Sequence, residues 1–128
     1  MSILVINMTR INAGVRANEL VDRHLLAEHR EIKRIPRAVS QGKYKLNGAP
    51  QNFRLGPGHV KFFYDKCKYL LNRYIEIREE CIRRGFKVQD WSSAWNPVPP
   101  ELMNDWQETL EAREEVLTRV NERLRSMS

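Results

Sequence analysis

Apolar residues recur at every third or fourth position along most of this 128-residue chain, which is the spacing of one face of an α-helix. The longest such series consists of Val60, Phe63, Tyr64, Cys67, Leu70, Leu71, Tyr74, Ile77, Cys81 and Ile82. Gly85 follows, and glycine commonly occupies the position after the last helical residue. The pattern therefore predicts a long core helix from about His59 to Arg84, with basic residues such as Arg73 on its other faces.

A shorter helix is expected earlier in the chain, beginning near Asn18, whose short polar side chain suits the N-cap position. Its inward-facing positions would be Leu20, Val21, His24, Leu25, Ile32 and Ile35. Pro36 either ends this helix or opens a short continuation that stops at Gly42. Residues 42–58 are rich in Gly, Pro and Asn, so we expect a loop there.

A third helix is expected to start at Pro99-Pro100, because proline is favoured in the first turn, and to run to the end of the chain. Its inward-facing positions would be Leu102, Trp106, Leu110, Arg113, Leu117, Val120, Leu124 and Met127. Residues 90–100 contain two tryptophans and three prolines, which indicates an ordered loop. Because no stretch alternates with period two, the sequence predicts an all-α fold, a single compact domain of three main helices with long ordered loops.

The formal net charge of the chain is +6, and this charge is unevenly distributed. Residues 1–87 hold 18 Lys or Arg and 8 Asp or Glu, whereas residues 88–128 hold 4 and 8. A basic body is typical of proteins that bind polyanions, because basic side chains displace counterions from nucleic acid. Charge that serves only solubility is the simpler explanation of a net +6 taken alone.

The loop also carries a local basic and aromatic cluster, Lys43, Tyr44 and Lys45, with Arg54 further on. Basic residues interleaved with an aromatic ring suit a nucleic-acid backbone and a stacked base. An ordinary solvated loop has the same composition, so the pattern alone leaves both interpretations open.

Cysteine and histidine spacing gives no indication of a disulfide or a metal centre. Cys67 and Cys81 fall in the same predicted helix, about 21 Å apart at helical rise, which is too far for a disulfide. None of the three histidines forms a zinc-binding pattern with either cysteine. The apolar run at residues 3–6 is too short for a membrane span or a signal peptide. We therefore expect no metal or other cofactor, no membrane association, and an intracellular, cytoplasmic protein.

One short stretch, residues 25–34, gathers the residues best suited to chemistry. It contains Glu31 with Arg30 beside it, and Arg34 follows about one helical turn later. His24 precedes Glu31 by seven residues, about two turns, and should point in the same direction. Nearby positive charge favours the ionised form of a carboxylate, which suits a group that stabilises a cation or takes a proton. A plain surface ion pair explains the same residues and is the commoner case.

Four segments together resemble one known family. They are Met-Thr-Arg-Ile-Asn at residues 8–12, His-Leu-x-Ala-Glu-x-Arg-Glu at 24–31, Phe-x-Leu-Gly-x-Gly-His-Val-x-Phe-Phe-Tyr-Asp-Lys at 53–66, and Glu-Cys-x-x-Arg-Gly-Phe at 80–86. These segments are similar to those of phage endonuclease V, whose family comprises pyrimidine-dimer DNA glycosylases with abasic-site lyase activity. The resemblance extends from Met8 to about Asp90 and is thin beyond that point.

The resemblance implies a reaction that needs an amine, because such an enzyme attacks the sugar carbon C1′ and then holds the sugar as an imine. An α-amino group, with a reference pKa of about 7.7–8.0, is partly free near neutral pH, unlike a lysine amine at about 10.4. Family members use the α-amino group of the threonine exposed when the initiator methionine is removed, which is Thr9 if translation starts at Met8. The family's catalytic carboxylate, which assists proton transfer and stabilises the imine, corresponds to Glu31.

The resemblance also implies a DNA-binding surface. Three basic residues match positions that line the family's DNA site, two match its last basic helical turn, and two more candidates lie in the 42–58 loop. The DNA-binding candidates are therefore Arg10, Arg30, Arg34, Arg119, Arg123, Lys43 and Lys45. The implied partner is double-stranded DNA containing pyrimidine dimers or abasic sites, bound by a monomer. Because a dimer is buried in the duplex, binding would kink the DNA and extrude a base.

Two features depart from the family pattern. The phage member ends in an aromatic-rich tail that helps engage DNA, whereas this chain stops at Ser128 without one; Tyr44, Trp91 and Trp95 are the available substitutes. Residues 1–7 form an N-terminal extension before the domain of residues 8–128. We expect the mature protein to begin at Thr9, without this extension.

A start at Met1 would instead make the nitrogen of Thr9 an amide, which cannot form an imine. The alternative function is therefore a non-catalytic helical DNA-binding protein that lacks a free amine at Thr9. A helical protein–protein adaptor that uses the amphipathic last helix is a third interpretation. The N-terminal residue separates the first two, and the salt dependence of DNA binding separates both from the third.

Overall fold

The computed structural model describes residues 9–126, and the predicted extension at residues 1–7 lies outside the described part. The described helices are α2 (Asp22–Glu31), α3 (Arg34–Ser40), α4 (His59–Phe63), α5 (Cys67–Arg83) and α6 (Leu110–Ser126), with 3₁₀ turns at Ala17–Glu19, Ser92–Trp95 and Pro100–Leu102. Within residues 9–126 no strand is present. The prediction of an all-α domain with long ordered loops is confirmed.

The first predicted helix begins later than expected and is followed by a continuation. Asn18 lies inside a 3₁₀ turn, and α2 begins at Asp22 after Val21, so the N-cap prediction is wrong. Pro36 lies in the first turn of α3, where its missing N–H breaks no helical hydrogen bond. Gly42 follows α3 with φ +72°, a conformation that favours glycine, and ends the continuation.

The predicted helix at residues 59–84 is interrupted at residues 64–66, where α4 ends and α5 has not yet begun. The interruption has a long-range cause, because Asn104 bonds to the backbone there. The side-chain Nδ2 of Asn104 donates to the backbone carbonyl of Asp65 at 2.8 Å, and the backbone carbonyl of Asn104 accepts the N–H of Tyr69 at 3.2 Å. The predicted end of the helix is confirmed, since Gly85 follows Arg84 with φ +90°.

The last helix begins ten residues later than Pro100, because residues 103–109 are not helical. The hydroxyl of Thr109 accepts the backbone N–H of Ala112 at 3.0 Å and so caps the helix at its observed start. Its most buried positions are Ala112, Val116 and Val120, whereas Leu110 is 67% exposed. Leu117, Val120 and Leu124 still pack on the core as predicted, and Met127 lies outside the described residues.

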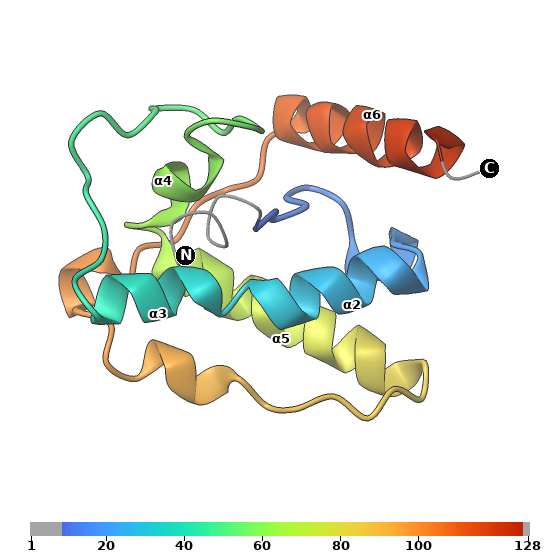
Figure 1. Ribbon diagram of the computed structural model, residues 1–128, viewed down its shortest axis with the longest axis horizontal. Coiled ribbons are helices and arrows are strands. Elements are labelled where there is room, and N and C mark those ends of the chain that lie inside the picture. Colours follow the sequence, from blue (N-terminus) through green and yellow to red (C-terminus); the bar gives the residue numbers. More distant parts are fainter. Residues whose placement is uncertain (1–8, 127–128) are drawn as a thin grey trace.

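α5 is the central element of the core. Figure 1 shows α2 and α3 following one another across α5, with α6 along the top of the view. The segment after α5, which includes the 3₁₀ turn Ser92–Trp95, runs along the bottom. One cluster of buried side chains includes Ile11, Phe62 and Leu70, and a second includes Leu25 and Val116. Because Ile11 is fully buried, the segment just after Thr9 passes through the core and is fixed there.

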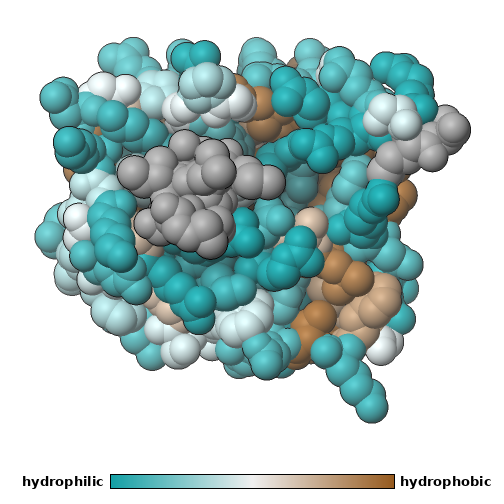
Figure 2. Space-filling view, in the orientation of Figure 1, coloured by the Kyte–Doolittle hydropathy of each residue, from teal (hydrophilic) through white to brown (hydrophobic). Residues whose placement is uncertain are grey.

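Cys67 and Cys81 are both buried and free, which confirms that they form no disulfide. Figure 2 shows that the face seen in this view is mostly hydrophilic. None of the described helices combines the length and the apolar composition needed to cross a membrane.

Candidate functional site

A cavity of about 430 Å³ lies where the segment after Thr9, α2, the loop before α4, and α6 meet. It is lined by Thr9, Arg10, Asn12, His24, Ala27, Glu28, Glu31, Leu55, Gly56, His59, Arg119 and Arg123. These residues are far apart in the sequence, and the fold brings them together by placing α6 over the first segment. Within residues 9–126 no group of three His, Cys, Asp or Glu side chains is placed to hold a metal ion.

Five of the predicted site residues line this cavity, namely Thr9, Arg10, Glu31, Arg119 and Arg123. The other four, Arg30, Arg34, Lys43 and Lys45, lie outside the lining. Lys43 and Lys45 are exposed on the loop between α3 and α4. The structure therefore separates the candidates into a set at one cavity and a set on the surrounding surface.

Glu31 reaches the cavity from the last turn of α2. Its side chain is 19% exposed, and its carboxylate lies 3.3 Å from the guanidinium of Arg30. His24 also lines the cavity, so the expectation that it points the same way as Glu31 is confirmed. Helical spacing accounts for this arrangement, because positions 24, 28 and 31 share one face of α2.

Glu28 is a second carboxylate in the cavity, and the sequence analysis did not assign it a role. It is 1% exposed and receives Nε and Nη2 of Arg73 at 2.7 and 3.0 Å. The side-chain amide of Asn12 donates to the same carboxylate at 2.8 Å. The two carboxylates of the cavity thus differ, since Glu28 is neutralised by a buried arginine whereas Glu31 is paired with the exposed Arg30.

Arg73 was expected on a solvent-facing side of the long helix, and this expectation is wrong. Its residue is 3% exposed, because it reaches inward from α5 to Glu28. The attraction of Glu28 raises the pKa of Arg73 despite the opposing effect of burial. A signal was present in the sequence, since Arg73 adjoins Tyr74 and follows Leu70 by three positions in an otherwise apolar stripe.

His59, the first residue of α4, fixes the backbone of the segment after Thr9. Its Nε2 accepts the backbone N–H of Ile11 at 2.9 Å, and its Nδ1 donates to the carbonyl of Arg54 at 2.8 Å. These two bonds require a neutral ring with its proton on Nδ1. Burial lowers the pKa of His59 to about 4, which keeps the ring neutral under ordinary conditions.

Three arginines place positive charge around the cavity from two directions. Arg10 comes from the first segment, whereas Arg119 and Arg123 come from successive turns of α6. The pKa of Arg10 is lowered by its burial and then by the charges of Arg123 and Arg119. Within residues 9–126 neither Arg10 nor Arg123 forms an ion pair, while Arg119 lies 3.7 Å from Glu122.

The same field acts on His24, whose pKa is lowered by burial and then by Arg10 and Arg123. Glu28 and Glu31 partly offset this positive charge at Arg10, but burial and the two α6 arginines have the larger effect on its pKa. Cations that lie close together in this way attract an anion such as a phosphate. The cavity thus combines three arginines, the carboxylate of Glu31 and residue Thr9 in one lining.

Comparison with known proteins agrees with this arrangement. The family model described as pyrimidine dimer DNA glycosylase matches residues 8–92. The match includes every residue of the cavity except Arg119 and Arg123 on α6. It covers about two thirds of the chain and all of α2 to α5, so this chain belongs to the pyrimidine dimer DNA glycosylase family.

Proposed function

We propose that this protein excises pyrimidine dimers from double-stranded DNA and nicks the resulting abasic strand through an imine formed by the α-amino group of Thr9. The observation that carries the proposal is the meeting of Thr9, Glu31 and unbalanced arginines at one cavity. The family supplies the DNA glycosylase activity, and the cavity supplies a place where the rest of the chemistry would occur.

In the proposed reaction the amine nitrogen attacks C1′, and the pyrimidine leaves with the electrons of the glycosidic bond and takes up a proton. The C1′–O4′ bond then opens as the nitrogen gives up a proton and O4′ takes one up, which leaves the imine and a free 4′-hydroxyl. The imine acidifies the C2′ proton, and loss of that proton expels the 3′ phosphate. The step requires a primary amine at residue 9, so residues 1–8 must be absent from the active protein.

Glu31 is the carboxylate best placed to serve this sequence of proton transfers. Glu28 lines the same cavity but is already bonded to Arg73 and Asn12, so its lone pairs are largely occupied. The negative charge of Glu31 would stabilise the cationic imine, and its oxygen would accept the proton from C2′. The exposed Arg30 keeps this carboxylate oriented.

The arginines would hold the damaged strand. Arg10, Arg119 and Arg123 surround the cavity and would bind phosphates next to the lesion. Arg30 and Arg34, at the junction of α2 and α3, and the loop residues Lys43 and Lys45 would contact the flanking duplex. Extrusion of a base from the stack would give the cavity access to C1′.

The test compares two matched chains, one beginning at Thr9 and one beginning at Met1, on duplex DNA that carries a pyrimidine dimer or an abasic site. Borohydride reduction converts an imine into a stable covalent adduct that is seen as a shift in protein mass. We expect the chain beginning at Thr9 to be trapped and to nick the strand. The chain beginning at Met1 should bind the DNA without being trapped.

Intact-mass measurement of the protein from its native cell completes this test. A native mass that corresponds to Thr9 as first residue supports the proposal. An active native enzyme that retains residues 1–7, or equal trapping of both chains, would overturn it. Binding without trapping by both chains would identify a non-catalytic DNA-binding protein instead.

A further inference from the structure

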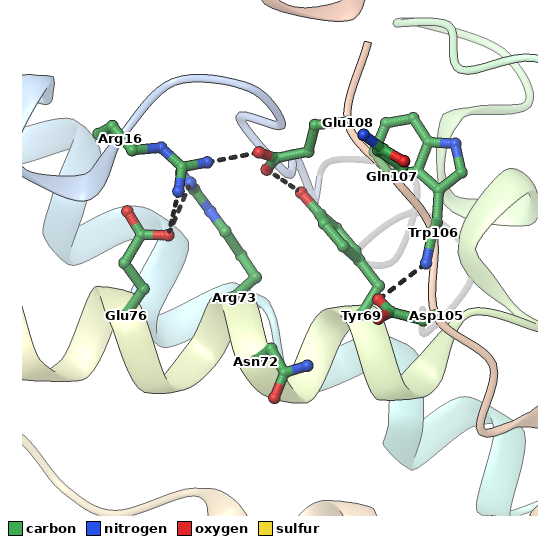
Figure 3. A pocket seen from close by; sticks show the side chains of 9 residues that line it. All are labelled: Arg16, Tyr69, Asn72, Arg73, Glu76, Asp105, Trp106, Gln107 and Glu108. Carbon is green, nitrogen blue, oxygen red and sulfur yellow. Dashed lines mark hydrogen bonds and ion pairs between the residues drawn. The ribbon is translucent and has the colours of Figure 1, made fainter.

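A second, more open cleft of about 650 Å³ lies on the other side of the Arg73–Glu28 ion pair from the cavity. It is lined by Arg16, Tyr69, Asn72, Arg73, Glu76, Asp105, Trp106, Gln107 and Glu108 (Figure 3). Arg73 lines this cleft, whereas its partner Glu28 lines the cavity that holds Thr9 and Glu31. One buried ion pair therefore connects the two sites through the interior.

The guanidinium of Arg73 is held by three groups. Nη1 donates to the carbonyl of Val15 at 2.6 Å and lies 3.7 Å from the carboxylate of Glu76, while Nε and Nη2 both reach Glu28. The side chains of Arg73 and Glu28 are 1% and 0% exposed, so water does not compete for these bonds. A planar guanidinium that is bonded in this way has a single orientation.

Because Arg73 fixes Glu28, Glu28 in turn fixes the backbone at Asn12. The side-chain amide of Asn12 donates to Glu28 at 2.8 Å, and the backbone N–H of Asn12 points to the same oxygen at 3.4 Å. The preceding N–H, of Ile11, is bonded to His59. Two consecutive residues are thus bonded to buried acceptors, and only Arg10 separates them from Thr9.

We propose that Arg73 is a positioning residue for the reaction: by neutralising and orienting Glu28, it holds residues 11–12 in place and keeps a second negative charge away from the amine of Thr9. The inference rests on the proposed function, because it concerns the same amine. Arg73 lines the cleft and not the cavity, so it would act on the reacting atoms only through Glu28.

The charge has a chemical consequence. A primary amine attacks C1′ only when it is unprotonated, and an unneutralised carboxylate nearby favours its protonated form. The amine shares its cavity with charged and titratable groups that the variants leave in place, namely Arg10, His24, Glu31, His59, Arg119 and Arg123. Without Arg73, the charge of Glu28 would be added to theirs, and the amine would be free only at higher pH. The segment at residues 11–12 would also be held less firmly, because Glu28 would lose the two bonds from Arg73 that fix its position.

The experiment uses the chain that begins at Thr9 and four proteins: wild type, Arg73→Met, Arg73→Lys, and the double variant Arg73→Met with Glu28→Gln. Imine formation is measured by borohydride trapping in single turnovers at saturating abasic-site duplex, from pH 5.5 to 9.5. Affinity is measured with a duplex containing a tetrahydrofuran analogue, which forms no imine. Thermal melting gives the folded fraction for each protein.

For Arg73→Met we expect trapping at neutral pH to fall by about tenfold and its pH profile to move up by about one unit, with affinity for the analogue within threefold of wild type. The double variant removes both charges and should return the profile to its wild-type position. Arg73→Lys keeps the charge and should also leave the profile in place. If Arg73→Met does not fold, Arg73→Gln, which keeps one donor toward Glu28, replaces it.

An unmoved pH profile in Arg73→Met, or a loss of affinity that parallels the loss of trapping, would limit Arg73 to fold stability and overturn the inference. Wild-type behaviour tests the proposed function separately. If wild type forms no trapped adduct, the proposed function itself fails; if wild type is trapped and Arg73→Met is trapped with the same profile, only the inference fails.

Discussion

The cavity and the cleft lie on either side of the same buried ion pair, and they treat charge in opposite ways. In the cleft, Arg16 bonds to Glu108 and lies 3.4 Å from Glu76, and the hydroxyl of Tyr69 donates to Glu108 at 2.6 Å. Figure 3 shows these side chains pointing toward one another. In the cavity, Arg10 and Arg123 face each other without an ion-pair partner in the described chain.

The difference indicates which site is prepared for a ligand. Charges that already satisfy one another gain little from an added ion, and exposed pairs contribute at most about 1 kcal/mol to stability. Like charges gathered in a half-buried site reduce stability until an anion arrives. The cavity is therefore the better candidate for a ligand site, whereas the cleft belongs to the scaffold that supports it.

The largest expected difference is in the rate of strand nicking when a carboxylate of each site is neutralised. Glu31→Gln keeps the shape of the side chain but removes its charge, and general acid–base assistance is worth about 10²–10⁴-fold. We expect single-turnover nicking to fall by at least about two orders of magnitude while binding of dimer-containing DNA is kept. Glu108→Gln in the cleft is the matched control and should nick at nearly the wild-type rate. Near-wild-type nicking by Glu31→Gln would return this residue to a surface ion pair.

Acid should lower the free energy of unfolding through His59, which lines the cavity and not the cleft. The pKa of His59 is about 4 in the folded protein and about 6.5 when unfolded, so the unfolded state binds the proton more tightly. The stability from neutral His59 is complete above pH 6.5 and is lost as the pH falls toward 4, by about 3 kcal/mol.

Urea unfolding at pH 7 and pH 4.5 measures this loss, and His59→Gln serves as the control because it has no proton to gain. The variant should show a clearly smaller loss of stability between the two pH values than the wild type. An equal pH dependence in both proteins would assign the acid sensitivity to other groups.

Salt dependence separates the two sets of arginines. Arg10→Gln and Arg123→Gln should each flatten the slope of log affinity against log salt by about one unit, because each removes one phosphate contact. Arg16→Gln in the cleft removes the same charge from the chain and should leave the slope unchanged. Fluorescence anisotropy across a salt series provides the measurement. Equal slopes for all three variants would show that total charge, rather than the cavity, governs binding.

The smallest effect is expected from the exposed charge of the cleft. The side chain of Arg16 is 51% exposed, so Arg16→Gln should lower the free energy of unfolding by no more than about 1 kcal/mol. Denaturant unfolding at low salt measures this change. A loss of several kcal/mol would mean that the cleft network is a principal source of stability.

Features that depend on residues close in the sequence could be predicted, whereas features that depend on contacts between distant residues could not. The face of α2 that carries His24 and Glu31 followed from helical spacing alone. The break between α4 and α5 did not, because it is made by Asn104, about forty residues later. The start of α6 was also missed, since Leu102 and Trp106 continue its apolar spacing through residues that are not helical.

The candidate site divides in the same way. Family resemblance suggested Thr9, Arg10 and Glu31 as site residues, and the structure brings them to one cavity with Arg119 and Arg123. The roles of Glu28, Asn12 and Arg73 depend on a buried pair that joins residues 45 positions apart. A charged residue on a helix is usually solvated, so the apolar neighbours Leu70 and Tyr74 were too weak a signal to predict that Arg73 is buried.

Because Ile11 is completely buried, the segment next to Thr9 should open only when the whole core unfolds. Amide hydrogens near a chain end usually exchange with solvent through local fraying, but this one is donated to a buried histidine inside the main core. Its exchange in heavy water should therefore be as slow as that of the α5 amides beside it. A protein built in this way cannot release residues 9–11 by a small local motion, so the proposed nucleophile should keep its geometry until the core itself opens.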